Sequence, residues 1–276
     1  MRHYRTPGSI LAERTFFSRP EIEKMADDEL RVAGCRPQQP EPIAVEKYLR
    51  RRHDGLEPTI ADLAPGLMGS ADLTNPRQPV ITIATEVFNG PEPRYRSTLA
   101  HETGHLVMHA SLFLDQEFLR ALELRRRGLH RAFECSGTDI NEAPRQPVNK
   151  ADPLFHLEYQ ANLFMVAMLL PKPLVRTCVA SWTQTTSLRG GGRETVLPDI
   201  HRREAIHQVA ETFTVSRTMA TFRLEELYGA PAATPTRPPV QFSFNFSAST
   251  DSPPQAWTGT DGSCGERNKE VLWTHP

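Results

Sequence analysis

Residues 95–109 read YRSTLAHETGHLVMH, and this stretch decides how the rest of the chain can be interpreted. On an α-helix, residues four apart lie on one face, so His101 and His105 would stand about 6 Å apart along the axis. Two imidazoles in that arrangement can bind one zinc ion. Glu102, next to the first of them, could then take a proton from the water that the ion binds. The alternative is an amphipathic helix whose histidines only pack against the core.

The residues around the two histidines predict a helix that is buried on most of its sides. The apolar positions are Leu99, Ala100, Leu106 and Val107. A buried imidazole needs a polar partner, and one metal ion would serve both rings. His109 continues the four-residue spacing, but it would lie about 12 Å from His101 along the axis, too far to share an ion with it. We therefore interpret His109 as a packing residue or as a support for the ligands.

A third ligand is expected from residues 154–171, a strongly apolar helix that ends at a proline. Glu158 shares one face of this helix with Ala161, Met165 and Met168. A carboxylate on an apolar face is costly unless a cation meets it, and zinc would be that cation. Three protein ligands would leave the fourth position open for water. His156 is the second candidate, and the alternative for Glu158 is a helix-start carboxylate that interacts with the helix dipole.

Composition and charge narrow the possible classes of protein. The 276 residues carry a formal net charge of -1, which favours neither nucleic acid nor a membrane surface. No apolar run approaches the length of a membrane span, and no continuous apolar core follows the basic start of the chain, so a secretory signal is not expected. The four cysteines are scattered without a C-x-x-C pair, which favours reduced thiols and a cytoplasmic location. We interpret Cys135 as a packed thiol, with a redox-sensitive thiol or a metal ligand as alternatives.

The sequence predicts an α+β fold that is mainly helical with a small sheet. Residues 7–34 show helical spacing, with an expected buried set of Ile10, Leu11, Ile22, Met25, Leu30 and Val32. A short helix is predicted over 42–49, and residues 111–150 look like an irregular excursion at the rim of the site. The clearest strand is 79–85. Its residues Ile81, Thr82 and Ile83 could form a free edge where an extended peptide substrate adds as a strand, or the strand could be internal.

The paired motifs resemble those of the ImmA/IrrE-type metallopeptidases, which are similar to gluzincins. The resemblance rests on His101-Glu102-Thr103-Gly104-His105 with the trailing His109, on Glu158-Tyr159-Gln160-Ala161-Asn162-x-Phe164, and on Leu169-Leu170-Pro171. It covers roughly residues 75–230. It implies a zincin-like fold in which His101, His105 and Glu158 bind one Zn²⁺ ion and Glu102 is the catalytic base. Mn²⁺ or another divalent ion stays possible.

The family also carries a helix-turn-helix-like unit after the peptidase part. Here residues 202–211 would form its first helix, and a second helix would be capped by Ser216. That second helix offers Arg217 and Arg223, but acidic residues follow at 225 and 226. Direct DNA binding is therefore not expected, and a packing unit or a surface that receives a protein substrate is favoured.

These observations together predict a domain organisation. We expect an N-terminal helical segment over 1–42, a zincin-like metallopeptidase domain over 43–180, the helix-turn-helix-like unit over 198–230, and a disordered tail over 231–276. Within the tail, the alternation in residues 241–246 could form one strand.

The predicted function is that of a zinc-dependent endopeptidase that hydrolyses a peptide bond with Glu102 as general base. Candidates for stabilising the oxyanion are His156, Tyr159 and Tyr95. The resemblance implies a regulatory protease, in a stress response or on a mobile element, whose protein substrate is a helix-turn-helix repressor. Two alternatives stay open: a catalytically idle zincin-fold module of a toxin-antitoxin or phage-type pair, and a DNA-binding regulator that uses residues 198–228.

Overall fold

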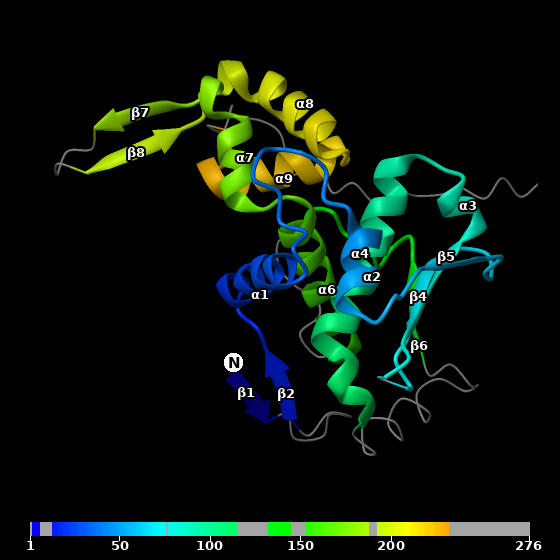
Figure 1. The fold of residues 1–276 in the computed structure, drawn as a ribbon. Coiled ribbons are helices and arrows are strands. Elements are labelled where there is room, and N and C mark those ends of the chain that lie inside the picture. The colour runs from blue at the N-terminus through cyan, green and yellow to red at the C-terminus, as the bar shows by residue number, and fades with distance from the viewer. Residues whose placement is uncertain are drawn as a thin grey trace, which may run out of the picture. The chain divides into compact units, whose positions relative to one another are not determined.

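The computed structural model describes residues 2–5, 13–75, 77–114, 132–144, 153–187 and 192–231. Its helices are α1 (Arg19–Val32), α2 (Val45–Arg52), α3 (Thr85–Phe88), α4 (Glu92–His109), α6 (Pro153–Leu169), α7 (Lys172–Cys178), α8 (Arg202–Phe213) and α9 (Arg217–Tyr228). Its strands are β1 (Arg2–Arg5), β2 (Glu13–Phe16), β3 (Thr59–Ala61), β4 (Leu67–Asp72), β5 (Val80–Ala84), β6 (Ala132–Ser136), β7 (Gln184–Ser187) and β8 (Arg193–Val196). The protein is therefore α+β, largely helical with a small mixed sheet, as predicted (Figure 1). None of the described helices combines the length and apolarity needed to span a membrane.

Helix α4 lies between the small sheet and α6, as the ribbon shows (Figure 1). It begins after Pro91, with a second proline in its first turn, and it contacts β4 and β5 on one side and α6 on the other. From Arg96 to His109 only Val107 is not buried. The prediction of a helix buried on most sides is confirmed, because two different layers of the fold pack against it.

The close approach of α4 and α6 depends on Gly104. A Cβ atom built there would lie 3.2 Å from both the Cα and the carbonyl oxygen of Ala161 on α6. Contacts of that length with backbone atoms are too tight for a side chain in an unchanged structure. The glycine between the two histidines thus allows the helices that carry the predicted ligands to pack closely.

The main sheet has the strand order β3-β5-β4-β6, with β3 parallel to β5 and the other neighbours antiparallel. Strand β5 matches the run predicted over 79–85, but it is not a free edge. Thr82 pairs with Thr59 on one side and Ser70 on the other, and Ile83 pairs with Ile60 and Gly69. The prediction that Ile81–Ile83 offer an edge to substrate is therefore wrong, because the backbone groups there are already paired within the sheet.

Two other segments differ from the sequence predictions. Residues 13–16 form β2, so the helix predicted over 7–34 begins only at Arg19, where the Glu21 carboxylate accepts a 2.8 Å hydrogen bond from the Ser18 backbone N–H. In α1, Ile22 and Leu30 are buried as predicted, Met25 is partly buried, and Val32 is 63% exposed because it lies in the last turn. Residues 10 and 11 lie outside the described residues. The region 111–150 is not wholly irregular, since it contains β6.

The helices α8 and α9 pack onto the same core as α4. The turn between them places Thr214 in the left-handed region (φ 52°), and the Ser216 side chain caps α9 by accepting a 3.1 Å hydrogen bond from Met219 N–H, as predicted. The buried Arg96 of α4 donates to the carbonyl oxygens of Thr214, at 3.2 Å, and Ile43, at 2.9 Å. All described residues fall within one compact unit. The predicted tail over 231–276, with its possible strand at 241–246, lies outside the described residues from 232 on.

Candidate metal centre

The structure brings together the three side chains that the sequence predicted as ligands. The Nε2 atoms of His101 and His105 lie 3.1 Å apart, and Oε2 of Glu158 lies 3.0 Å from the first and 3.2 Å from the second. Ligand atoms bound tetrahedrally to zinc at 2.0–2.1 Å are about 3.3–3.4 Å from one another. The three donor atoms thus form a triangle close to one face of such a tetrahedron.

Both histidines come from α4 and the carboxylate comes from α6. The two rings are fully buried, and the side chain of Glu158 is 16% exposed. Burial lowers the pKa of His105, so its ring is neutral and its lone pair is available to an ion. We refer to His101, His105 and Glu158 as the metal triad.

The second nitrogen of His101 is held by an amide that sequence reasoning missed. Its Nδ1 lies 3.1 Å from Oδ1 of Asn162, and the same oxygen accepts a 2.8 Å hydrogen bond from the backbone N–H of Asn141. Because Asn162 also donates to the carbonyl oxygen of Asp139 at 2.7 Å, the orientation of its amide is fixed with the oxygen toward the ring. His101 must then carry its proton on Nδ1, which leaves the lone pair of Nε2 available to bind a metal ion.

The second nitrogen of His105 begins a longer chain of contacts. Its Nδ1 lies 3.1 Å from Nδ1 of His109, whose Nε2 lies 3.2 Å from Oε1 of Gln160, and Nε2 of Gln160 lies 2.9 Å from Nε2 of His156. If Nε2 of His105 binds an ion, its Nδ1 donates to His109, which donates to Gln160, which donates to His156. Every group in that order has the donor and acceptor that it needs. Burial and the neighbouring His105 lower the pKa of His109 to about 3, so this ring is neutral.

His109 therefore contacts Nδ1 of His105 and is not one of the three converging side chains. The amides at 160 and 162 were the part of the site that the sequence analysis overlooked. The available signal was their position, because they are the two amide residues of an otherwise apolar helix and they lie two and four residues after Glu158. Amides in such a helix need partners, and here the partners are the histidine rings.

Glu102 is fully buried beside the metal triad. Neither of its carboxylate oxygens has a hydrogen-bond partner among the described residues. Burial raises the pKa of Glu102 well above its usual value, and the charge of Glu158 raises it further. A carboxylate in this position lacks the cation that would stabilise its charge. The donor set of the triad and this unpartnered carboxylate both fit a divalent cation.

Strand β4 leaves space for Glu102 at one position. A Cβ atom at Gly69 would lie 2.9 Å from Cγ2 of Thr98 and 3.0 Å from Oε1 of Glu102. Gly69→Ala is therefore expected to lower the free energy of unfolding by about 1–3 kcal/mol, because a buried helix would have to move away from the sheet. Urea unfolding measures the difference. In the control Gly137→Ala, the nearest atom to the new Cβ is 3.6 Å away, so the change should be small, and equal effects at both glycines would contradict the expectation.

The three oxyanion candidates lie in different surroundings. Tyr95 lies six residues before His101, with its ring edge-on to Phe88 at 5.6 Å, and burial, with the charge of Glu46, raises its pKa. Tyr159 accepts a hydrogen bond from Arg19 at 3.3 Å. His156 is partly buried and is connected to the triad through Gln160 and His109. The connection of His156 reaches the triad at Nδ1 of His105, not at the Nε2 atom that belongs to the three donor atoms.

The second C-terminal helix presents less basic surface than its sequence indicated. Arg223, one of its two predicted basic positions, is fully buried and donates to the carbonyl oxygen of Leu170 at 2.7 Å and to Glu226 at 2.8 Å. Arg223 is therefore not available to contact DNA, and of the two basic positions only Arg217 is exposed. The side chain lies inside the protein because Glu23 of α1 and Glu226 neutralise it there.

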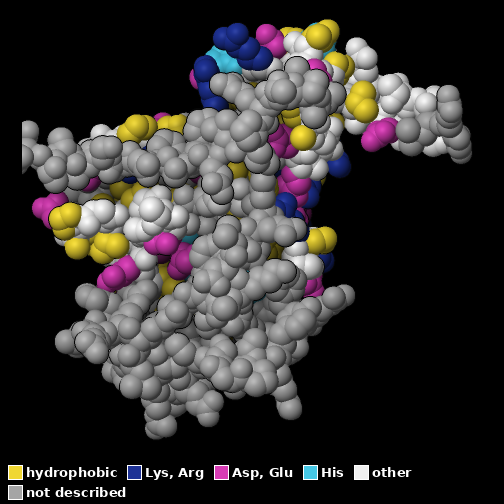
Figure 2. All heavy atoms as spheres, turned by 180° about the vertical axis from the view of Figure 1, so that it is seen from behind, with side chains coloured by type: hydrophobic (Ala, Val, Ile, Leu, Met, Phe, Trp, Pro, Cys, Tyr) yellow, Lys and Arg dark blue, Asp and Glu magenta, His cyan; other side chains and the backbone are white. Residues whose placement is uncertain are grey.

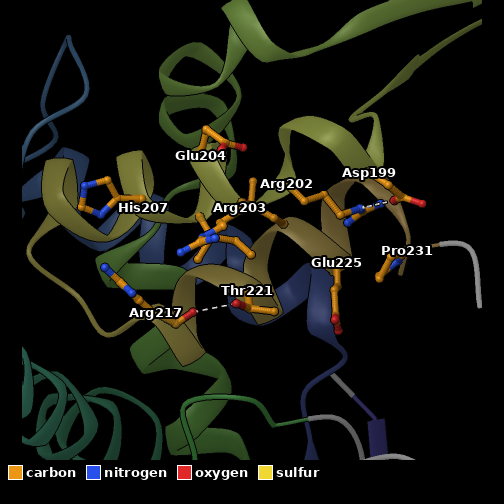
Figure 3. Close-up of a pocket in the computed structure, with 11 residues that line it drawn as sticks. Asp199, Arg202, Arg203, Glu204, His207, Arg217, Thr221, Glu225 and Pro231 are labelled. Atoms are coloured by element: carbon orange, nitrogen blue, oxygen red, sulfur yellow. Dashed lines mark hydrogen bonds and ion pairs between the residues drawn. The ribbon is translucent and has the colours of Figure 1, made fainter. Parts of the chain in front are cut away.

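A pocket of about 560 Å³ lies along α8 and α9 and shares no residue with the metal triad. Its charged lining residues are Asp199, Arg202, Arg203, Glu204, His207, Arg217 and Glu225. Figure 3 shows Arg203, His207 and Arg217 on one side and the ion pair of Asp199 with Arg202 on the other. The view from behind likewise shows basic and acidic side chains next to one another at the top of the molecule (Figure 2). Three arginines face three carboxylates, so this is not the uniformly basic surface that a DNA phosphate backbone requires.

The comparisons with known proteins identify no family. No protein-family model matches the chain, and no curated protein matches its sequence significantly. The description of the site therefore rests on the geometry above.

Proposed function

We propose that this chain is a zinc-dependent endopeptidase with a zincin-like fold, and that Glu102 is its general base. The observation that carries the proposal is the convergence of three donor atoms within 3.2 Å, from two helices, beside a buried carboxylate that accepts no hydrogen bond from the described residues. An isolated buried carboxylate is costly to a protein, and such groups are concentrated at functional sites. A helix that only packs in the core would be more stable with an apolar residue at position 102 than with an unpaired carboxylate.

His101, His105 and Glu158 would hold the ion. A zinc ion bound there supplies a Lewis acid that polarises a peptide carbonyl and acidifies water. Glu102 accepts the proton of the attacking water and later passes it to the leaving amine. Asn162 and His109 hold the two imidazoles in the tautomer that leaves Nε2 free. His156, Tyr159 and Tyr95 stay the candidates for the oxyanion donor.

Strand β6 replaces β5 as the proposed docking edge for an extended peptide. In the described part of the chain β6 pairs only with β4, so its other side is an edge of the sheet. It also lies against the triad, because the ring of Phe133 stacks on that of His105 with centroids 4.1 Å apart. A peptide that added to β6 would run past the metal centre.

The substrate class follows from the resemblance to the ImmA/IrrE-type metallopeptidases, which implies cleavage of a repressor with a helix-turn-helix domain. In this resemblance, α8 and α9 take the place of the helix-turn-helix-like unit of the family. With Arg223 buried, they support a packing or substrate-receiving role better than reading of DNA.

Metal analysis tests the proposal. The purified chain should retain one zinc ion per molecule after dialysis, and His101→Ala and Glu158→Gln should lose it. The control is His207→Ala, because His207 is an exposed ring on α8. Full metal content in both ligand variants, or none in the unaltered chain, would overturn the metal centre.

The amide that holds His101 gives a separate prediction. Asn162→Ala is expected to lower zinc affinity by about 10–100-fold, because the ring loses the partner that fixes its tautomer and orientation. Competition with a chromophoric chelator measures the affinity. Asn75→Ala, in an exposed turn, should leave the affinity unchanged. An Asn162→Ala protein that binds zinc as tightly as the unaltered chain would show that the amide has only a structural role.

A further inference from the structure

Cys135 lies on the sheet strand next to the metal triad and belongs to a second group of potential metal ligands. Its Sγ, a carboxylate oxygen of Glu102 and a ring nitrogen of His101 lie within 4.8 Å of one another. The thiol is 1% exposed, donates a weak 3.6 Å hydrogen bond to the carbonyl oxygen of Ser136, and interacts with the Glu102 side chain. The sequence favoured a packed thiol here, because no ligand stood at a metal-binding spacing from it. The structure brings potential ligands close to Cys135 although none is near it in the sequence, because β6 packs against α4.

The second group shares one atom with the metal triad. Nδ1 of His101 is engaged by Asn162 at 3.1 Å, so only its Nε2 faces other ligands. That Nε2 is also the atom 3.0 Å from Glu158. An ion bound by His101, Glu102 and Cys135 would therefore use the nitrogen that the metal triad needs. The two positions exclude each other.

We propose that His101, Glu102 and Cys135 form a second, inhibitory metal position that overlaps the first and takes thiophilic divalent ions. The proposal rests on the metal centre proposed above. The two groups differ in softness: the metal triad offers two imidazoles and a carboxylate, whereas the second offers a thiolate, which soft ions such as Cd²⁺ prefer and Mn²⁺ does not.

Occupation of the second position explains how inhibition would arise. The ion binds the carboxylate of Glu102, which otherwise has no hydrogen-bond partner among the described residues, so that carboxylate can no longer accept a proton. The thiol of Cys135 gives up its proton to solvent as the metal–sulfur bond forms, because a coordinating thiol is deprotonated.

Cadmium absorption tests the second position without reference to activity. A variant with Cys35, Cys178 and Cys264 all replaced by serine keeps Cys135 as its only thiol. Titrated with Cd²⁺, it should develop a thiolate-to-metal charge-transfer band in the ultraviolet that saturates at one ion per chain. Cys135→Ser in the unaltered background should remove this contribution and lower Cd²⁺ affinity by more than about tenfold, the smallest loss that even a supporting partner of a ligand produces. Circular dichroism checks that each variant is folded. If the triple variant does not fold, the same band is obtained by subtracting the Cd²⁺ absorption spectrum of Cys135→Ser from that of the unaltered chain.

Glu158→Gln distinguishes two overlapping metal positions from a single position that also includes Cys135. It disables the metal triad but leaves His101, Glu102 and Cys135 in place, so the cadmium band should persist while zinc content falls. If the band disappears with Glu158→Gln, the sulfur is a fourth ligand of a single ion and the second position is refuted. If Cd²⁺ binds at one ion per chain without a sulfur band, the inference fails and the proposed metal centre stands. If neither Cd²⁺ nor Zn²⁺ binds at all, both fail.

Discussion

Glu102→Gln is expected to abolish peptide hydrolysis while leaving the zinc ion in place. Glutamine has the shape of glutamate but cannot accept a proton from water, so the general-base contribution of about 10²–10⁴-fold in kcat is lost. The metal triad does not include residue 102, and its three donor atoms are unaffected by the change. The measurement pairs metal analysis with hydrolysis of a quenched fluorescent peptide library by the zinc-loaded protein.

The matched control for that experiment is Glu92→Gln. Glu92 is an exposed carboxylate in the first turn of the same helix, so its change removes an equal charge without touching the site. Unchanged hydrolysis in Glu102→Gln would remove the residue from the mechanism. A zinc-loaded chain that cleaves neither the library nor a repressor protein would instead support the idle zincin-fold module.

The helices that carry the ligands could be predicted because their signals are local. The four-residue spacing of His101 and His105 fixes their common face once a helix forms, and α4 and α6 both appear where the apolar pattern placed them. Glu158 could be singled out because a carboxylate on an apolar face needs a cation. Each of these inferences needs only the helical repeat within a single helix, without information about its partners in the fold.

The sheet could not be predicted to the same degree because strand order depends on long-range pairing. The run that became β5 is apolar whether it is an edge or an internal strand, and only its partners β3 and β4 decide between them. Strand β6 is a run of five residues, Ala132–Ser136, without a clear alternation. The strand forms through its pairing with β4, and that pairing places Cys135 beside the proposed metal centre.

Arg223 is a third kind of case, in which the signal was present but ambiguous. A basic residue on the second helix of a paired unit can face DNA or the interior. The deciding information was Glu226, three residues further along the same helix, together with Glu23, which is 200 residues away in the sequence. A carboxylate three residues away on the same helix is also common beside exposed arginines, so Glu226 alone does not distinguish a buried Arg223 from an exposed one.

Arg223→Ala is expected to lower the free energy of unfolding by about 3–5 kcal/mol, the usual cost of removing one partner of a buried ion pair. Arg223 is fully buried, and it joins three elements: it donates to Glu23 of α1 at 2.9 Å, to Glu226 of its own helix, and to the carbonyl oxygen of Leu170 at the end of α6. Truncation leaves these partly buried acceptors with Lys172, which lies 3.4 Å from Glu23 and 2.8 Å from Glu226, and with Arg19, which lies 3.9 Å from Glu226. Urea unfolding followed by circular dichroism measures the loss.

Arg217→Ala is the control, since Arg217 is an exposed arginine in the first turn of the same helix and its loss should change stability by no more than about 0.5 kcal/mol. The double variant Arg223→Met with Glu23→Gln should recover part of the loss, because one of the stranded charges is then removed and the volume of the side chain is kept. Equal stability of Arg223→Ala and Arg217→Ala would show that the buried network contributes nothing. Because α1, α6 and α9 meet at this one guanidinium, a large loss would mean that the C-terminal helices help to hold in place α6, which carries Glu158 of the proposed metal centre.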